Sequence, residues 1–133
     1  MYGVRVRILI AEDERINQLY MSLVLSAAGH EIAVAGDGLV VLGCLTEQPY
    51  DLIFMDIHMP GVDGLEAARR IRAGEAGEDR AHVPIVAVTA YATDDDEALY
   101  AGAGINRVAM KPLSEDGLLR IIDEINHCNG ENA

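Results

Sequence analysis

The chain has 133 residues, of which half are hydrophobic, and 22 acidic residues against 10 Lys and Arg give it a formal net charge of −12. This length suits one domain with its own core and leaves little room for a second. We expect so acidic a domain to repel nucleic acid and anionic membranes, and no extended basic patch in the sequence offsets that average.

The two cysteines, Cys44 and Cys128, form no CxxC pair, and we interpret both as free thiols in a reducing compartment. No apolar stretch reaches the roughly 18 residues that a membrane span needs. The N-terminus lacks the long apolar segment and small-residue cleavage site of a signal peptide. These features predict a cytoplasmic protein.

Strand-like and helix-like segments alternate along the chain. Continuous apolar or β-branched runs predict strands, and apolar residues at helical spacing predict helices. The first helix, for example, carries Ile16, Leu19, Leu23 and Ala27 on one face. The predicted order is strand 4–10, helix 16–28, strand 31–35, helix 38–47, strand 51–55, helix 64–73, loop 74–82, strand 84–88, helix 93–102, strand 107–110 and helix 114–127.

Five strands alternating with five helices indicate an α/β domain, a doubly wound parallel sheet that helices cover on both faces. The connections between strands should be right-handed. We expect the domain to span residues 1–127 and residues 128–133 to form a disordered tail. Sheets of this kind bind ligands at the carboxyl ends of their strands.

Polar side chains follow four of the five predicted strands. Glu12 and Asp13 follow the first strand, Asp56 the third, Thr89 the fourth and Lys111 the fifth. Each of them alone has an ordinary explanation as a helix cap or a turn residue. Because the carboxyl ends of parallel strands meet at one edge, we expect all five side chains to lie together.

Three carboxylates at one edge of a sheet repel one another. Two unit charges ~4 Å apart repel by roughly 4 kcal/mol at an effective dielectric constant near 20. The cluster therefore needs a cation, and oxygen ligands suit Mg²⁺. A carboxylate beside a metal can attack phosphorus as a nucleophile, while Lys111 pairs with one phosphoryl oxygen and Thr89 donates a hydrogen bond to another.

These residues lie in segments that resemble the receiver domain of response regulators. The segments are ILIAEDE, DLIFMDIHMPGVDGLEAARRIR, PIVAVTA and MKPL, and the resemblance covers about residues 6–125. The segments MDIHMPGVDGLEA and EDERIN are most similar to those of receivers attached to hybrid sensor histidine kinases. The resemblance implies a flavodoxin-like, five-stranded sheet of order 2-1-3-4-5 with five helices.

The resemblance also divides the site residues into two sets by role. The set that handles the phosphoryl group is Asp56 as phosphoacceptor, Thr89 and Lys111. The set that holds Mg²⁺ or Mn²⁺ is Glu12, Asp13, Asp56 and the backbone carbonyl of His58.

The implied function is a metal-dependent transfer of a phosphoryl group from a phosphohistidine onto Asp56, in two-component phosphorelay signalling. The donor partner is a histidine kinase or a histidine phosphotransfer domain. The receiver phosphorylates and dephosphorylates itself and is not a turnover enzyme. It is either a single-domain response regulator or part of a hybrid kinase, whose parent chain would be a histidine kinase.

Two details near the fifth strand follow from the same resemblance. Receivers usually have a cis peptide bond after the lysine, so we expect Lys111–Pro112 to be cis, although only about 5–6% of such bonds are. Many receivers carry Tyr or Phe three residues before the lysine, where this chain has Val108. Valine has no ring to swing inward, so we expect phosphorylation to alter the face of the fourth helix little.

Three alternatives to this function differ from it in chemistry. A receiver-like interaction module would keep the fold without phosphorylation, although the intact set of site residues argues against it. A phosphatase of the haloacid-dehalogenase type needs a second Asp two residues after its nucleophile, where this chain has His58. A flavodoxin needs a phosphate-binding loop after the first strand, where this chain has the acidic segment AEDERIN.

Overall fold

The computed structural model describes the backbone of residues 5–131 and the side chains of residues 5–126. Strands and helices alternate in the predicted order, and a short 3₁₀ helix, Glu78–Arg80, interrupts the predicted loop. The strands are β1 (Arg7–Ala11), β2 (Glu31–Ala35), β3 (Leu52–Asp56), β4 (Ile85–Thr89) and β5 (Arg107–Met110). The helices are α1 (Arg15–Ala27), α2 (Gly38–Glu47), α3 (Gly64–Arg72), α4 (Asp94–Gly102) and α5 (Glu115–Glu131).

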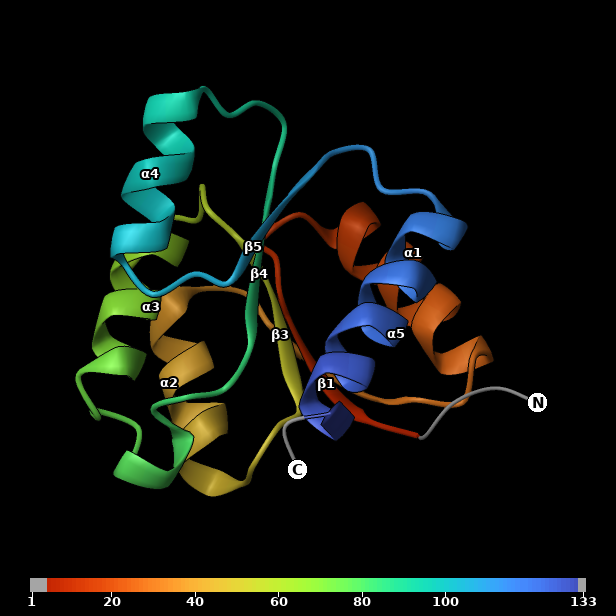
Figure 1. The fold of residues 1–133 in the computed structure, drawn as a ribbon, viewed down its shortest axis with the longest axis horizontal. Helices are drawn as coiled ribbons and strands as arrows, with labels where there is room; N and C mark the ends of the chain where they lie inside the picture. Colours follow the sequence, from red (N-terminus) through yellow and green to blue (C-terminus); the bar gives the residue numbers. More distant parts are fainter. Residues whose placement is uncertain (1–4, 132–133) are drawn as a thin grey trace.

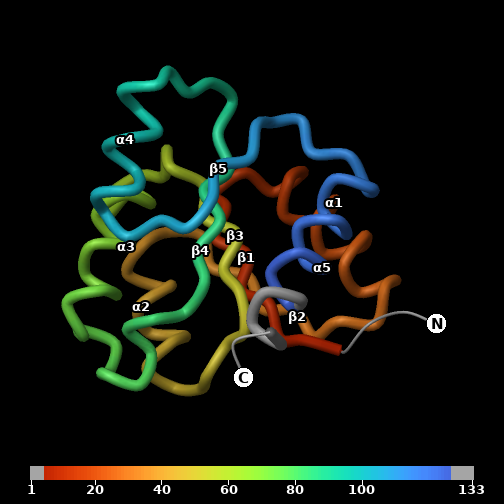
Figure 2. The backbone as a smooth tube through the Cα atoms, in the orientation of Figure 1, coloured from red at the N-terminus to blue at the C-terminus, as the bar shows by residue number. Residues whose placement is uncertain are grey.

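The five strands form one parallel sheet in the order β2-β1-β3-β4-β5. Helices α1 and α5 cover one face of this sheet, and α2, α3 and α4 cover the other (Figures 1 and 2). The predicted doubly wound α/β fold and its strand order are therefore confirmed.

The core consists of two apolar layers, because successive side chains of a strand point to opposite faces of the sheet. Leu9 and Ile53 pack in the layer beneath α2, α3 and α4. Ile8, Ile10 and Phe54 pack in the layer beneath α1 and α5. Strands β3 and β4 are buried along their whole length, which explains why their sequences are continuous apolar runs.

Helix α1 turns the apolar face that its sequence spacing indicates away from the sheet. Ile16, Leu19 and Leu23 expose 74%, 51% and 71% of their surface. The helix contacts the core through Met21 and Leu25 instead. Helix α1 is therefore apolar on two sides, of which the described residues cover only one.

The strand and helix ends differ slightly from the predicted ones. Strands β3 and β4 each run one residue further, so Asp56 and Thr89 are the last residues of their strands. Helix α5 reaches Glu131, whereas its predicted end is residue 127. Residues 132–133 and the side chain of Cys128 lie outside the described residues, whereas Cys44 is a half-buried free thiol. The boundary of the domain at residue 127 stays a prediction.

Within residues 5–131, no helix combines the length and the apolar character that crossing a membrane requires.

Candidate functional site

The register between β1 and β3 brings two predicted site residues to the same level. Ala11 pairs with Met55 across these adjacent strands. Glu12 and Asp56 are the next residues along each chain segment, so both reach the carboxyl edge of the sheet together. Their side chains are nearly inaccessible to solvent, with 3% and 7% of their surface exposed.

The strands on the other side of Asp56 add further site residues to the same row, which runs along the carboxyl edge of the sheet. Asp56 pairs with Val88, and Thr89, the next residue, pairs with Met110. Lys111 follows Met110 directly and so begins the loop at that edge. The loops after β4 and β5 lie at the top of the sheet in Figure 1.

The acidic side chains gather around one ammonium group. Glu12, Asp13 and Asp56 each place a carboxylate oxygen within 4.8 Å of the others. The Lys111 Nζ atom lies 3.0 Å from Glu12 Oε1 and 3.4 Å from Asp56 Oδ2. Three carboxylates thus face a single cation of the described residues, which leaves the cluster with an excess of negative charge.

Lys111 stays charged in this environment. Burial acts to lower the pKa of its ammonium group, but the hydrogen bond to Glu12 and the charges of Asp56 and Glu12 together raise it above the ordinary value. The ammonium is therefore available as a fixed positive charge beside Asp56 at physiological pH.

Backbone N–H donors fix the two buried carboxylates, and a side-chain donor fixes the main chain of Glu12. The His58 backbone N–H donates to Asp56 Oδ1 at 3.0 Å. The Glu14 backbone N–H donates to Glu12 Oε2 at 3.0 Å, and the Gln18 amide donates to the Glu12 carbonyl. The imidazole of His58 itself is exposed, so its backbone is what contacts Asp56.

Gly64, at the start of α3, packs directly against the backbone of Asp56. A Cβ atom at this position would lie 2.2 Å from the Asp56 carbonyl oxygen. The Gly64 N–H donates to the Ile57 carbonyl at 3.0 Å. The role of Gly64 could not be predicted from the sequence, because a glycine at a helix start has no chemistry that marks it.

Thr89 lies in the same row but makes other contacts. Its buried hydroxyl donates to the Tyr91 carbonyl at 3.1 Å. On the far side of the row, the Lys111–Pro112 peptide bond is cis, as predicted. The structure thus gathers Glu12, Asp13, Asp56 and Lys111 at one place and puts Thr89 at the end of the neighbouring strand.

The sequence matches the family model of the response regulator receiver domain over residues 8–123. The chain belongs to this family. Its relatives include the hybrid signal transduction histidine kinase I of Dictyostelium discoideum, 37% identical over 122 residues, and the sensor protein GacS of Pseudomonas syringae pv. syringae, 32% identical over 116. These alignments cover 88% and 87% of the chain, but only 7% and 13% of the two relatives.

Solved receiver domains have the same fold. The receiver domain of sensor histidine kinase PA1611 from Pseudomonas aeruginosa PAO1 is 34% identical, with a TM-score of 0.82 over 92% of this chain and 99% of that one. Its crystal structure has a magnesium ion coordinated in the active-site cleft. The chemotaxis protein CheY4 of Vibrio cholerae, 22% identical with a TM-score of 0.84 over 92% of this chain and 99% of that one, shows the likeness of fold alone.

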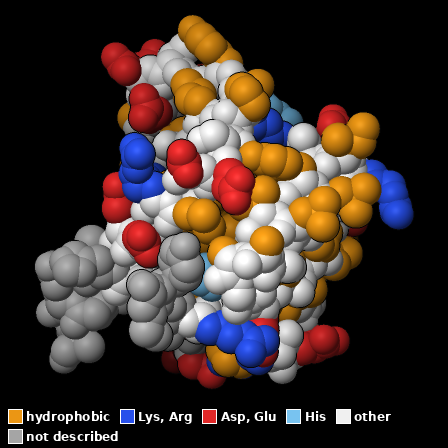
Figure 3. Space-filling view, turned by 90° about the vertical axis from the view of Figure 1, so that its right-hand side faces the viewer, with side chains coloured by type: hydrophobic (Ala, Val, Ile, Leu, Met, Phe, Trp, Pro, Cys, Tyr) orange, Lys and Arg blue, Asp and Glu red, His pale blue; other side chains and the backbone are white. Residues whose placement is uncertain are grey.

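An apolar hollow of about 560 Å³ opens beside the acidic cluster of this receiver domain. It lies between α1 and the loop after β5, with Ile16 and Tyr20 on one side and Leu113 on the other. The Tyr20 hydroxyl donates to the Leu113 carbonyl at 2.9 Å and joins the two walls. Figure 3 views the side of the molecule that carries α1 and α5, where orange apolar side chains gather in one area.

Proposed function

We propose that this receiver domain takes a phosphoryl group from a phosphohistidine onto Asp56, in a reaction that requires a divalent cation. The observation that carries the proposal is the buried Asp56 carboxylate, which lies beside two more acids and within 3.4 Å of the Lys111 ammonium. Such a carboxylate can attack an electrophile that carries its own negative charge when Lys111 and a divalent cation offset the repulsion.

In the proposed step, a carboxylate oxygen of Asp56 attacks the phosphorus atom of the phosphohistidine. The phosphorus–nitrogen bond breaks, its electron pair stays on the imidazole nitrogen, and an acyl phosphate forms on Asp56. Lys111 contributes by holding a phosphoryl oxygen, and Thr89 by donating its hydroxyl to another. Attack of water on phosphorus would later return free phosphate and the Asp56 carboxylate, so each protein molecule is both reactant and catalyst.

The donor set fits a hard divalent cation. Carboxylates of Glu12, Asp13 and Asp56 are the oxygen ligands that Mg²⁺ prefers. The backbone carbonyl of His58, two residues after Asp56, would supply a fourth oxygen. When bound, Mg²⁺ or Mn²⁺ would neutralise the excess negative charge of the carboxylates and the incoming phosphoryl group. The magnesium ion in the related PA1611 receiver domain supports this assignment.

The outer face of α1 suits an apolar helical partner such as a histidine kinase or a histidine phosphotransfer domain. In a chain with a net charge of −12, α1 contains no acidic residue, and it presents Ile16, Leu19 and Leu23 to solvent. The hollow next to Lys111 continues this face toward Asp56. We propose that the phosphohistidine-bearing helix docks here, within a cytoplasmic hybrid kinase or with a separate donor, and that neither nucleic acid nor membrane binds.

The chemistry is tested by incubation with acetyl phosphate and Mg²⁺, followed by intact-mass measurement. We expect the protein to gain the mass of one phosphoryl group, and neither the Asp56→Asn variant nor protein in excess chelator to gain it. Labelling of Asp56→Asn would contradict the assignment of the acceptor. An unlabelled wild-type chain would favour a silent interaction module instead.

The docking face is tested by comparing two phosphoryl donors. Leu23→Glu should slow transfer from a phosphorylated histidine phosphotransfer domain and leave labelling by acetyl phosphate unchanged. Leu39→Glu is the matched control, because Leu39 is similarly exposed but lies on α2. Equal effects of the two substitutions on transfer from the protein donor would refute the proposed docking face.

A further inference from the structure

Helix α1 is hydrogen-bonded to both of the loops that carry the ion pair between Glu12 and Lys111. Its Gln18 amide donates to the main-chain carbonyl of Glu12, in the loop after β1. Its Tyr20 hydroxyl donates to the main-chain carbonyl of Leu113, in the loop after β5, at 2.9 Å. Glu12 and Lys111 are 99 positions apart in the sequence, so one helix holds both sides of a long-range contact.

The loop after β5 leads from the sheet toward the side that carries α1 and α5 (Figure 1). The sheet fixes its start, because the Lys111 N–H donates to the Thr89 carbonyl at 2.8 Å. Within residues 5–126, the Tyr20 hydroxyl makes the one hydrogen bond that joins α1 to the main chain of this loop. The main chain around Lys111 is therefore held from two sides, by β4 and by α1.

The Lys111 side chain has to reach across a neighbouring strand to meet its partners. Strand β5 is at the edge of the sheet, and β4 lies between it and β3, whose last residue is Asp56. The Lys111 Nζ atom nevertheless lies 3.4 Å from Asp56 Oδ2. Because a lysine stem is flexible and loses rotamer freedom when it is held extended, the ammonium stays beside Asp56 only if the loop keeps its place.

The hydrogen bond of Tyr20 matters more for this loop than for the stability of the domain. The side chains of Tyr20 and Lys111 line the same apolar hollow, together with Pro112. Tyr20 exposes 41% of its surface, and water can replace the partner of an exposed hydroxyl at little cost in folding free energy. The carbonyl that accepts the bond, however, belongs to a residue two positions after Lys111.

Resting on the proposed function, we infer that Tyr20 is a positioning residue for Lys111: through the Leu113 carbonyl, it holds the loop after β5 where the Lys111 ammonium reaches Asp56. Tyr20 touches none of the reacting atoms, and its effect on phosphoryl transfer passes through Lys111. Helix α1 thus serves the chemistry of the site as well as the proposed docking of the donor.

The test measures labelling of Asp56 by acetyl phosphate and Mg²⁺ in the Tyr20→Phe variant, which keeps the ring in the hollow and removes the hydroxyl. We expect labelling to slow about tenfold, which corresponds to about 1.4 kcal/mol in the activation barrier. Acetyl phosphate needs no docking face, so the loss cannot come from a weaker partner contact. Mg²⁺ affinity, measured by calorimetry, should not fall, because Lys111 is not a metal ligand.

A matched control is Tyr50→Phe, which removes a phenol hydroxyl on the other side of the sheet. Tyr50 accepts a hydrogen bond from the Gln48 amide at 3.0 Å and packs in the layer beneath α2, α3 and α4. We expect this variant to label at the wild-type rate. In a Lys111→Met background, Tyr20→Phe should not slow labelling further, because the ammonium that it positions is absent.

The outcomes separate this inference from the proposed function. If the wild type is not labelled with acetyl phosphate and Mg²⁺, the proposed function fails. If the wild type is labelled, three results overturn only the role of Tyr20: an unchanged rate in Tyr20→Phe, an equal loss of rate in Tyr50→Phe, or a loss that persists in the Lys111→Met background. A residue that merely stabilises the fold would slow labelling whether or not Lys111 is present, so dependence on Lys111 is the distinguishing result.

Discussion

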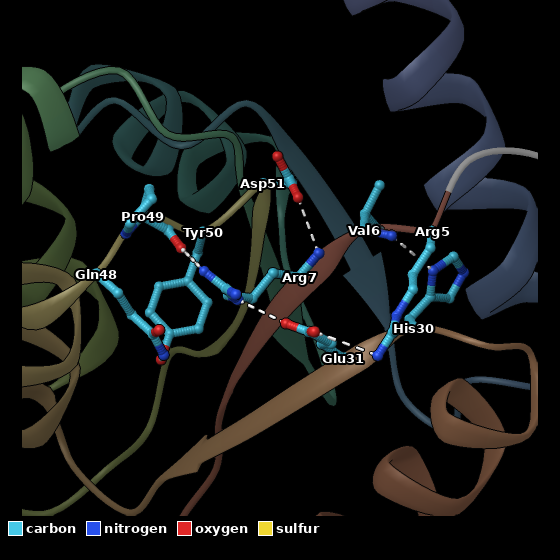
Figure 4. Close-up of polar contacts among 9 residues, drawn as sticks. All are labelled: Arg5, Val6, Arg7, His30, Glu31, Gln48, Pro49, Tyr50 and Asp51. Atoms are coloured by element: carbon cyan, nitrogen blue, oxygen red, sulfur yellow. Dashed lines mark hydrogen bonds and ion pairs between the residues drawn. The ribbon is translucent and has the colours of Figure 1, made fainter.

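Charged side chains gather at both ends of this sheet, and the two ends differ in balance. At the amino end, Arg7 Nε lies 2.8 Å from Glu31 Oε2 and Arg5 Nη2 lies 3.2 Å from Glu31 Oε1 (Figure 4). The Arg7 backbone N–H donates to Asp51 at 2.8 Å. Two cations thus meet two acids there, whereas three acids meet one cation at the carboxyl end.

The two ends also differ in exposure to solvent. The side chains of Arg5 and Glu31 expose 67% and 44% of their surface, so their ion pair is screened and contributes little. Those of Glu12 and Asp56 are almost fully buried. A cluster of charges is ordinary on a protein surface, whereas a buried cluster with unequal charges is unfavourable until something binds to it. Burial and imbalance together, not charge alone, distinguish the candidate site.

The largest expected effect comes from removing Lys111, the one cation that the described residues place at the carboxyl end. Lys111→Met should slow labelling of Asp56 by acetyl phosphate about 100-fold, because the developing charge loses a preorganised donor. Arg7→Met removes a cation from the amino end and should leave the labelling rate unchanged. Time courses by intact mass measure both labelling rates. A comparable loss of rate in the two variants would contradict the proposed difference between the two ends.

A second prediction concerns how closely α3 packs against the backbone of Asp56 at the carboxyl end of the sheet. Gly64→Ala places a methyl group against the Asp56 carbonyl and should lower the free energy of unfolding by about 1–3 kcal/mol. Gly43→Ala, on α2, has open space around its Cβ position and should stabilise the chain by up to about 1 kcal/mol. Urea titrations compare them, and a neutral Gly64→Ala would show that α3 can retreat from Asp56.

Neutralising one acid at each end should change stability in opposite directions. Without divalent cations, Asp13→Asn should raise the free energy of unfolding by about 1 kcal/mol, because it relieves repulsion. Glu31→Gln should lower it, because the hydrogen bond and charge of Arg7 hold the pKa of Glu31 below its ordinary value. Thermal unfolding in chelator measures the signs, and the same sign at both ends would contradict the proposed imbalance.

The smallest expected effect is a pH dependence at the amino end. The Val6 N–H donates to His30 Nδ1 at 3.2 Å, and burial lowers the pKa of His30, although Asp123 acts to raise it (Figure 4). The unfolded chain therefore binds more protons than the folded one near and below pH 6.5, so stability should fall as the pH drops through that value. His30→Gln should reduce the slope of the free energy of unfolding against pH. An unchanged slope would show that other groups cause the pH dependence.

The sequence pattern was sufficient for the strands and the clustered acids, and the family resemblance implied the order of the strands. Strands β3 and β4 consist of apolar residues up to a polar last residue, because helices cover both faces of the sheet. The two strands and the polar residues at their ends could therefore be predicted from the sequence. Periodicity did indicate the outward face of α1, but it cannot tell a face that meets the core from one that faces solvent. Burial of Met21 and Leu25 depends on how the helix is rotated against the sheet, which only tertiary packing decides.

The burial of Tyr100, which exposes 5% of its surface, was beyond sequence patterns for a related reason. Nothing in the spacing of α4 indicates that its tyrosine packs in the apolar layer beneath α2, α3 and α4. Gly64 was missed because close approach of backbones leaves no signature beyond the glycine itself. The reactive residues at strand ends can thus be predicted from one sequence, whereas the packing around them cannot.

Asp56 and Thr89 are the last residues of β3 and β4, and this position has a consequence for motion. The sheet's hydrogen bonds anchor their backbones, so these amides should exchange with solvent deuterium only through rare, large openings of the domain. The adjoining loops can fluctuate far faster without carrying the acceptor along. Asp56 and the adjoining loops would then move on different timescales. The loops could respond to a phosphoryl group whose position the sheet holds fixed.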